Sequence, residues 1–227
     1  LALITVTSRI GILLLNLWPH CTNHLMKTKI FFGLRAKSKT CNYFIVSLVL
    51  FFISCGSINY KRLSAENPSA LIAMEDSLIE IEPSEVLIHS LGKAHNSLGE
   101  KFLKKKELSK AKNSFSKALA YSKNDTSYLY NYYMTEGHIL LKKGNKNGLW
   151  DGIEFYYKAV KLKPSLGEPH YYIGRSYQKI GSTDFDLIIE SYQNALQLIL
   201  SDEIKDKVNR DLDKTVARKN RLEKFWK

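Results

Sequence analysis

The chain has 227 residues, and its 34 Lys and Arg residues outnumber its 22 Asp and Glu residues, which gives a formal net charge of +12. Residues 1–55 hold six of the basic residues and no acidic ones, so residues 56–227 carry 28 basic and 22 acidic residues, a net charge of +6. Glu residues are interspersed along this part, which is typical of a solvated surface rather than a nucleic-acid groove. We therefore expect no nucleic-acid partner.

Residues 1–25 form a separate segment in the sequence. This segment begins without a Met, and its apolar stretch, Leu1 to Trp18, is interrupted by Arg9. The stretch is either a transmembrane helix or an upstream extension that the cell does not translate. We favour the second interpretation, because a complete export signal begins at Met26.

Residues 26–55 have the successive parts of a bacterial export signal. A basic segment follows Met26, and an apolar segment from Tyr43 to Ile53 then leads to Cys55. The basic residues are Lys27, Lys29, Arg35, Lys37 and Lys39. The apolar segment is well short of the roughly 18 residues of a membrane-spanning helix, which favours a signal peptide.

Cys55 ends the tetrapeptide Phe-Ile-Ser-Cys and is followed by Gly56. This arrangement resembles the lipobox of bacterial lipoprotein signal peptides, although Phe52 stands where Leu is usual. The resemblance implies that Cys55 receives a diacylglycerol and becomes the new N-terminus. Gly56, at a position where Asp would matter for sorting, implies the outer membrane of a Gram-negative envelope, facing the periplasm. Two alternatives stay open: a cleaved secretory signal with an incidental Cys, or an uncleaved short anchor.

The residues after Cys55 predict a short linker followed by helices. Residues 56–68 are polar and predict a tether. Residues 69–91 predict an N-terminal helical cap, with a short helix from Ser69 to Ile81 and a fresh helix start at Ser84. Beyond this point the periodic apolar segments contain almost no Pro or Gly, and the residues that interrupt them fall between segments, which indicates an all-α fold.

Three alignable units follow within residues 92–200. Their matching positions are Leu98, Gly99, Phe102, Ala111, Phe115 and Ala118 in the first unit; Tyr133, Gly137, Leu140, Gly144, Tyr156, Ala159 and Pro164 in the second; and Ile173, Gly174, Tyr177, Gly181, Tyr192 and Ala195 in the third. The pattern resembles the tetratricopeptide repeat. Gly152 departs from it, standing where a helix-packing Ala is expected, and about three extra residues lie in the loop from Gly144 to Gly148.

The repeated positions have physical roles in such an array. We assign close approach of the two helices of a unit to Gly99, Gly137 and Gly174, and the filling of space between successive units to Phe115, Tyr156 and Tyr192. One hairpin cannot bury its own apolar face, so about three stacked units are near the lower limit for an independent array. The resemblance implies a right-handed α-solenoid of about three helical hairpins; an unrelated helical bundle is the alternative.

Residues 201–227 predict a C-terminal capping helix. Ser201 is its candidate N-cap, acidic residues follow at once, and apolar residues recur along one side. Such a helix would cover the exposed face of the last repeat. Its basic end, beside Phe225 and Trp226, suggests a second possible role in contact with anionic lipid.

The first helices of stacked units line the concave face in this kind of array, so helical phase nominates a partner-binding groove. The nominated residues are Lys93, Asn96, Glu100 and Lys104 in the first unit; Asn131, Met134, His138 and Lys142 in the second; and Tyr171, Arg175, Gln178 and Lys179 in the third. This mixture of aromatic, amide and basic groups suits an extended peptide or an acidic helix. We expect a protein or peptide partner and no small-molecule substrate.

A search for catalytic or metal-binding motifs leads to the prediction that the chain is not an enzyme. Its histidines after Cys55 lie in different predicted helices or turns, and no His-Glu-x-x-His pair occurs; they are His89, His95, His138 and His170. Residues 144–152 lack the strand and the Gly-Lys-Ser/Thr ending of a phosphate-binding loop. Cys21 and Cys41 precede the predicted cleavage point, so a mature lipidated chain would have no thiolate site. We therefore expect no catalytic residue, metal or cofactor.

The functional hypothesis is a membrane-anchored interaction scaffold of the bacterial envelope, lipidated at Cys55. Two alternatives stay open, one from another class and one within binding proteins. The first is an accessory subunit of an envelope enzyme complex, with the chemistry in a neighbouring chain. The second is a glycan-associated lipoprotein of the cell wall, with Trp150, Tyr171 and Tyr172 as its stacking platform.

Overall fold

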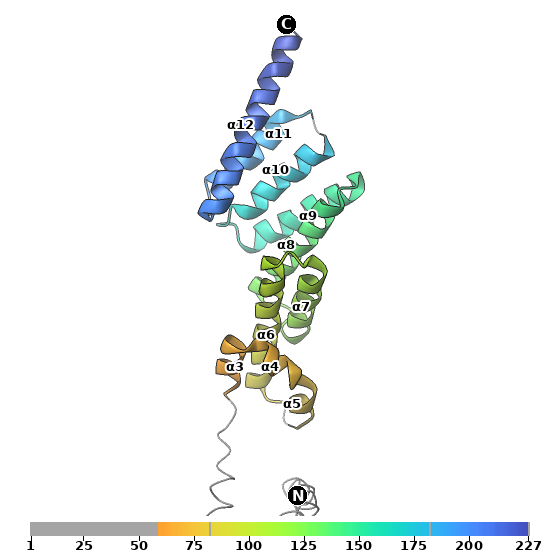
Figure 1. The fold of residues 1–227 in the computed structure, drawn as a ribbon, viewed down its shortest axis with the longest axis vertical. Coiled ribbons are helices and arrows are strands. Elements are labelled where there is room, and N and C mark those ends of the chain that lie inside the picture. Colours follow the sequence, from red (N-terminus) through yellow and green to blue (C-terminus); the bar gives the residue numbers. More distant parts are fainter. Residues whose placement is uncertain (1–58, 82, 182, 227) are drawn as a thin grey trace, which may run out of the picture. The chain divides into compact units, whose positions relative to one another are not determined.

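The computed structural model describes residues 59–81, 83–181 and 183–226, all within one compact unit that spans residues 58–227. We call it the helical unit. Its described residues form ten helices (Figure 1), and the prediction of an all-α fold is confirmed. They are α3 (Tyr60–Glu66), α4 (Pro68–Ala73), α5 (Glu75–Ile81), α6 (Glu85–Lys104), α7 (Leu108–Tyr121), α8 (Thr126–Lys143), α9 (Lys146–Leu162), α10 (Glu168–Ile180), α11 (Phe185–Leu196) and α12 (Asp202–Phe225). The predicted signal, its Cys55 and the segment before it lie outside the described residues.

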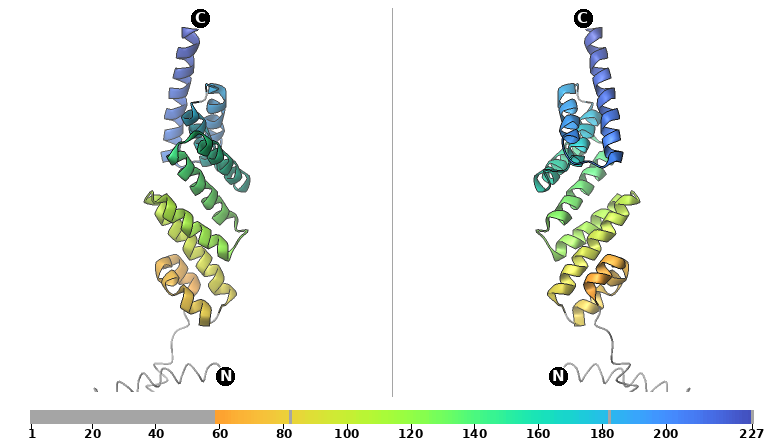
Figure 2. Two further views of the ribbon diagram at one scale, coloured as in Figure 1. Left: turned by 90° about the vertical axis from the view of Figure 1, so that its right-hand side faces the viewer. Right: turned by 90° about the vertical axis from the view of Figure 1, so that its left-hand side faces the viewer.

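Six of these helices pair into three hairpins, α6 with α7, α8 with α9, and α10 with α11. Each helix from α6 to α12 packs against the next one along the chain, so the hairpins stack in sequence order (Figures 1 and 2). The helix α12 packs on α11 and covers the last hairpin. The prediction of a solenoid of three hairpins with a C-terminal capping helix is therefore confirmed.

Local sequence signals explain where several helices begin and end. Ser84, Asp125 and Asp184 are N-caps whose side-chain oxygens accept hydrogen bonds from backbone N–H groups in the first turn. Gly144 and Gly181 end α8 and α10 in the left-handed region, with φ angles of 75° and 81°. Side chains rarely adopt this conformation, which explains why glycine terminates both first helices.

The repeated glycines lie directly under large aromatic rings. A Cβ atom added at any of them would come within 2.5–2.6 Å of a ring carbon, closer than carbon atoms can approach. The pairs are Gly99 with Phe115, Gly137 with Tyr156, and Gly174 with Tyr192, and all three rings are fully buried. Each ring thus packs first inside its own hairpin, against the first helix. Of the three, Tyr156 also stacks on the next hairpin, with its ring centre 5.5 Å from that of Tyr172.

Several predicted boundaries differ from the observed ones. The predicted tether contains α3, because Asn59 caps a helix that packs on α6. The predicted single helix from Ser69 to Ile81 is two helices, α4 and α5. The boundary between cap and array at residue 91 falls inside α6. The loop expected between Gly144 and Gly148 is shorter, because α9 begins at Lys146 and absorbs the extra residues as helix.

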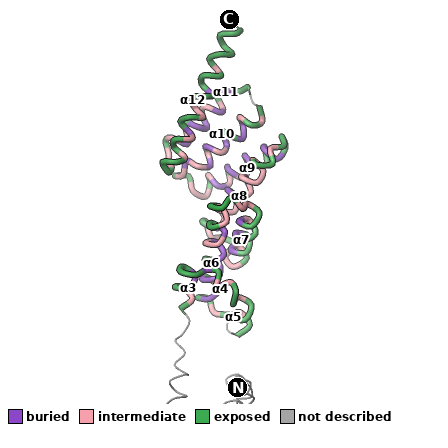
Figure 3. Tube along the Cα trace, viewed as in Figure 1, coloured by how far each residue is buried: buried purple, intermediate pink, exposed green. Residues whose placement is uncertain are grey.

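Buried residues follow the seams between helices (Figure 3) and gather in two apolar clusters. The N-terminal cluster joins α4 to α6 and consists of Leu71, Leu87, Leu91 and Ala94. The C-terminal cluster joins α8 to α12 and is rich in tyrosine; it consists of Tyr130, Met134, Ile153, Tyr156, Ala159, Tyr171, Ile173, Tyr177, Ile188, Tyr192, Ala195 and Val208. The second cluster fixes α8 and α10 side by side, and the candidate site lies between these two helices.

Candidate functional site

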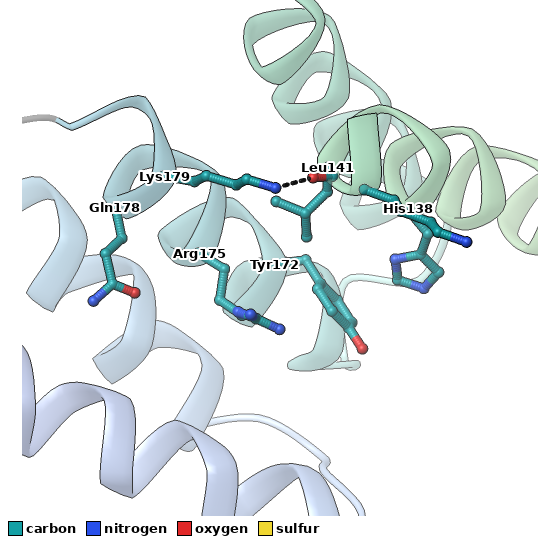
Figure 4. Close-up of a pocket in the computed structure, with 7 residues that line it drawn as sticks. His138, Leu141, Tyr172, Arg175, Gln178 and Lys179 are labelled. Carbon is teal, nitrogen blue, oxygen red and sulfur yellow. Dashed lines mark hydrogen bonds between the residues drawn. The ribbon is translucent and has the colours of Figure 1, made fainter. Parts of the chain in front are cut away.

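A hollow of about 610 Å³ lies between α8 and α10, the first helices of the second and third hairpins (Figure 4). We call it the α8–α10 groove. Its lining residues are His138, Leu141, Lys142, Tyr172, Arg175, Gln178 and Lys179. On each helix these residues are three or four positions apart, so each helix turns a single face toward the hollow. The groove is therefore a product of helical phase and of the packing of two hairpins.

Two aromatic rings, His138 and Tyr172, form one wall of the groove, and the buried Tyr156 ring supports them. The His138 imidazole meets the Tyr172 ring edge-on, with centroids 4.4 Å apart, and its Nδ1 is hydrogen-bonded to the Tyr156 hydroxyl at 2.9 Å. Burial raises the pKa of Tyr156 well above 10, so this hydroxyl keeps its proton. The buried Tyr156 ring stacks in turn on Tyr172. A core residue thus holds two groove residues in place.

The charge in the groove comes from Lys142, Arg175 and Lys179. Burial, and secondly the positive charge of Arg175, lower the pKa of His138 to about 4, so its ring is neutral at pH 7. Arg175 has only a loose acidic neighbour, since its Nε lies 4.0 Å from Asp211 Oδ2. The groove is therefore cationic around a neutral aromatic wall.

The three cations are not equally available to a ligand. Lys179 donates a hydrogen bond from Nζ to the Leu141 carbonyl at 2.8 Å, drawn as the dashed line in Figure 4. Lys142 lies in the last turn of α8, where the helix dipole attracts a positive charge. Arg175 lies in the middle of α10 and leaves 47% of its side chain exposed. Arg175 and Lys142 are thus the cations best placed to meet an acidic group.

Five predicted groove residues meet in this hollow, namely His138, Lys142, Arg175, Gln178 and Lys179. Three others form a hydrogen-bonded set between the first and second hairpins. Asn96 Nδ2 donates to Glu100 Oε1 at 2.9 Å, and Asn131 Nδ2 donates to Asn96 Oδ1 at 3.0 Å and to Glu100 Oε1 at 3.2 Å. The predicted first-helix face therefore divides into a cationic groove and a neighbouring polar set. The remaining predicted residues of α6, Lys93 and Lys104, are exposed.

Two predicted groove residues are core residues instead, which corrects the prediction for them. Met134 is 4% exposed and Tyr171 is 2% exposed, so neither offers a surface to a partner. Tyr171 faces the last helix, where its hydroxyl donates to Asp211 Oδ2 at 3.1 Å. Helical phase alone does not separate Tyr171 from Tyr172, since both lie about one turn before Arg175; the packing of α12 decides between them.

Sequence reasoning missed Leu141 and Tyr172 as lining residues of the groove. Leu141 is three residues after His138 and Tyr172 is three residues before Arg175, so each shares a helix face with a residue that was predicted. Including the residues three positions from His138 and Arg175 as well as those four positions away would have found both. The reversed assignment of Tyr171 and Tyr172 also affects the glycan alternative, because a buried Tyr171 has no ring face for a sugar.

No described group of three or more His, Cys, Asp or Glu side chains could hold a metal ion. His95 is buried, its Nε2 lies 2.8 Å from Glu75 Oε2, and both residues are far from the groove in sequence. His89 is exposed. Residues 144–152 contain the start of α9, and the element that precedes it is the helix α8. That the chain is not an enzyme stays a prediction. Among the described helices, none is both long and apolar enough to cross a bilayer.

Comparisons with known proteins give fold likenesses only. No protein-family model matches the chain, and no curated protein matches its sequence. Among solved structures, residues 41 to the end of MamA from Desulfovibrio magneticus RS-1 match with a TM-score of 0.44 and 17% identity over 69% of this chain and 88% of that one. MamA AMB-1 matches with a TM-score of 0.43 and 14% identity over 73% and 92% of the two chains.

The first tetratricopeptide domain of human RPAP3 matches with a TM-score of 0.43 and 13% identity over 59% of this chain and 98% of that one. At these TM-scores and identities the three structures support no conclusion about function. The functional argument therefore rests on the groove itself.

Proposed function

We propose that the helical unit is a protein-binding scaffold and that the α8–α10 groove takes an acidic segment of its partner. The observation that carries this proposal is the cationic groove with its neutral aromatic wall. Arg175 and Lys142 match carboxylates by charge, while Tyr172 and His138 offer ring surface to an adjacent side chain. Two successive hairpins supply these groups, so the site exists only in the stacked array.

The partner segment is expected to continue toward the first hairpin. The set formed by Asn96, Glu100 and Asn131 lies on α6 and α8. Asn96 is buried, so the partly exposed Asn131 amide and the exposed Glu100 carboxylate are the groups that can exchange hydrogen bonds with a backbone. An extended chain leaving the groove along α8 would meet this set next. The proposal therefore predicts a segment with acidic residues at the end that lies in the groove and no requirement for acidic residues at the other end.

A displayed library of random peptides, selected on residues 58–227, tests this proposal. Selected peptides should be enriched in Asp and Glu, and synthetic copies should bind more weakly as salt is added. The double variant Arg175→Glu with Lys142→Glu should weaken their binding at least about tenfold. Lys161→Glu, an exposed position on α9, is the control and should leave the affinity nearly unchanged.

Two results would contradict the acidic-segment proposal. One is selection of peptides without an excess of acidic residues. The other is binding that Arg175→Glu and Lys161→Glu weaken equally, because net charge rather than the groove would then account for it. Circular dichroism of each variant would show that the fold is retained, since the substituted side chains are exposed or lie at the surface of the groove.

We also propose that the chain is anchored to a membrane of the bacterial envelope through a lipid on Cys55, with the outer membrane facing the periplasm as the expected site. Its support is the pattern of basic segment, apolar segment and Ser-Cys-Gly in the sequence. Expression from Met26 in a Gram-negative host should give a mature mass that begins at a lipidated Cys55. Cys55→Ser should lose both the lipid and membrane retention, and an unmodified soluble product from the parent would overturn the proposal.

The accessory-subunit alternative differs from the scaffold in what groove variants change. If a copurifying enzyme slows with His138→Ala or Arg175→Ala, the groove regulates a neighbouring chain. If the variants release the partner from the membrane while the rate of the enzyme is unchanged, the scaffold hypothesis is supported. The structure gives less support to the glycan alternative, because one of its three predicted stacking residues, Tyr171, is buried. A second, Trp150, packs against Tyr177 in an edge-to-face contact with ring centroids 5.8 Å apart.

A further inference from the structure

The last turns of α12 carry large apolar side chains that no described residue covers. Leu222 is 38% exposed, Phe225 is 78% exposed and Trp226 is 82% exposed. We call residues 218–226 the α12 end. In the view of Figure 1 and in the two views of Figure 2, this part of the helix extends past α11. Its apolar groups thus add nothing to the core.

The packing of α12 explains this exposure. The buried residues of the helix are Val208, which packs in the C-terminal cluster, and Thr215. Further along α12, Arg218 and Lys219 contact the start of α11. Lys219 Nζ lies 2.6 Å from Asp186 Oδ1, and the Arg218 guanidinium lies over the Phe185 ring. Beyond Lys219 the helix has run past the hairpin that it caps. A helix that only capped the array would have no packing reason to continue.

The exposed groups lie on one side of the helix. Successive residues of an α-helix are rotated by about 100°, which places Phe225, Leu222 and Trp226 within an arc of about 100°. Arg218 lies inside this arc, and Arg221 and Lys219 flank it. The α12 end is therefore amphipathic, with basic groups beside its apolar arc.

The charge of the α12 end is strongly positive. It has four basic residues, Arg218, Lys219, Arg221 and Lys224, and one acidic residue, Glu223. Lys219 is paired with Asp186 and lies 3.9 Å from Glu223. Arg221 and Lys224 form no ion pair with any residue that the structure describes. Arg221, which flanks the apolar arc, is thus available to an anionic surface, and Lys224 on the opposite face adds to the positive charge of the same turn.

We propose that the α12 end binds the surface of an anionic lipid bilayer. Aromatic rings prefer the boundary between headgroups and acyl chains, and neighbouring Arg and Lys residues pair with anionic headgroups. The α12 end is a protruding helix rather than a groove, and a bilayer can deform around such a shape. This inference is independent of the α8–α10 groove and of the lipid on Cys55.

A second copy of the chain is a poorer occupant. A parallel copy would bring the basic residues of two α12 ends together. An antiparallel copy would lay each α12 end along the first half of its partner's α12, whose outward positions are polar: Lys205, Asp206, Asn209 and Arg210 are all exposed. Charge repulsion would thus oppose the parallel arrangement, and the antiparallel one would leave apolar surface uncovered.

Vesicle binding by residues 58–227 tests the proposal, because this unit contains every described helix and both apolar clusters. Replacing Trp150 by Phe leaves Trp226 as its only tryptophan. Vesicles of phosphatidylcholine and phosphatidylglycerol in equal parts should shift Trp226 fluorescence to the blue, and added salt should reverse the shift. Vesicles of phosphatidylcholine alone should leave it nearly unchanged.

Two double variants separate the charge from the rings. Arg221→Gln with Lys224→Gln should weaken vesicle binding at least about fivefold, mainly through Arg221, which flanks the apolar arc. Phe225→Ser with Trp226→Ser, followed by sedimentation with vesicles, should weaken it at least about tenfold. Lys205→Gln with Lys214→Gln removes the same charge from exposed positions elsewhere on α12 and should bind as the parent does. Thermal melting should be unchanged throughout.

Three results would overturn the proposal. The first is equal binding to both kinds of vesicle. The second is an equal loss in the control and in Arg221→Gln with Lys224→Gln, which would indicate net charge alone. The third is a concentration-dependent dimer that Phe225→Ser with Trp226→Ser abolishes, without any vesicle binding by the parent; the apolar arc would then belong to a second copy.

Discussion

The N-terminal region of the helical unit, α3 to α7, and the C-terminal region, α8 to α12, are built from the same hairpin plan with different core chemistry. The N-terminal cluster is aliphatic, with Leu71, Leu87 and Leu91 at its centre. The C-terminal cluster contains five buried tyrosines, Tyr130, Tyr156, Tyr171, Tyr177 and Tyr192. Aliphatic side chains have no hydrogen-bonding group, whereas a buried tyrosine carries a hydroxyl that usually forms a hydrogen bond.

That difference links core and surface in the C-terminal region. Tyr156 is hydrogen-bonded to His138, and Tyr192 donates a hydrogen bond to Gln178 at 3.2 Å. Both partners line the α8–α10 groove. Packing of the third hairpin therefore also orients the groove, so we expect stability and binding to be coupled there.

The N-terminal region has one buried polar centre of its own. The Glu75 carboxylate in α5 lies 2.8 Å from His95 Nε2 in α6 and accepts a hydrogen bond from the Tyr121 hydroxyl in α7. Burial raises the pKa of Glu75, but the hydrogen bonds from Tyr121 and His95 outweigh it and lower the pKa below 4.5. This centre joins three helices without reaching the groove.

Removing the ring that links core and groove should have the largest effect. Tyr156→Ala deletes a fully buried ring that touches α8 and α10, and should lower the free energy of unfolding by about 4 kcal/mol. Urea unfolding measures this loss. Tyr157→Ala is the matched control, because its ring is 45% exposed, and should cost less than about 1 kcal/mol. Similar losses in both variants would contradict the assigned packing.

Filling the space under that ring should be the next largest effect. A Cβ atom at Gly137 would lie 2.5 Å from the Tyr156 ring, so Gly137→Ala should lower the free energy of unfolding by about 2 to 3 kcal/mol. At Gly152 the nearest atom is 3.4 Å away, and Gly152→Ala should instead stabilise α9 by about 0.5 to 1 kcal/mol. Thermal melting of both variants checks the opposite signs, and a shared sign would refute the close approach.

The two regions should lose stability in different pH windows. The pKa of His138 is about 6.5 in the unfolded chain and about 4 in the folded one, so only the unfolded chain binds this proton between those values. Lowering the pH from 6.5 toward 4 therefore favours unfolding, by about 2 kcal/mol at pH 5. Urea unfolding of the parent and of His138→Gln measures this, and the variant should depend less on pH in this window.

The pKa of Glu75 is lowered as well, but its window lies at lower pH. Its pKa in the folded chain lies below its ordinary value of 4.5, so the stability that it contributes is present above pH 4.5 and is lost as the pH falls further. Glu75→Gln should flatten the dependence below pH 4.5 and leave the His138 window intact. A loss of the His138 window in Glu75→Gln would contradict the separation of the two regions.

The smallest effect is expected where the two regions meet. Asn131→Ala removes both hydrogen bonds that Asn131 donates to α6, to Asn96 and to Glu100, and should cost about 1 kcal/mol in the free energy of unfolding. Asn113→Ala, at an exposed position on α7, is the control and should cost less than about 0.5 kcal/mol. Equal values would mean that these hydrogen bonds contribute nothing measurable between the hairpins.

Much of the fold could be predicted because its signals are local or periodic. Ser84 and Asp184 mark helix starts through their own side chains, and Gly144 and Gly181 mark helix ends through a backbone conformation that other residues avoid. The helix α3 was missed because Asn59 is its only clear signal within a short polar segment. Its contact with α6, which helps to hold it, is not visible in the local pattern.

The candidate site was predictable only in part, for the same reason. Periodicity placed His138, Lys142 and Arg175 on first-helix faces, and the structure brings them together. It did not distinguish Tyr171 from Tyr172, which are neighbours in sequence. That choice depends on the rotation of α10 between α9 and α11 and on the helix that covers Tyr171.

The sequence by itself determined the helical hairpins, the glycines at which their helices approach closely, and the capping helix, because spacing and residue size dictate these over short distances. Only the tertiary structure decided which tyrosines are core and which line the groove, that His138 is neutral, and that the α12 end extends past its hairpin. These properties depend on burial and on the angle between packed helices. Both arise from contacts between residues that are far apart along the chain.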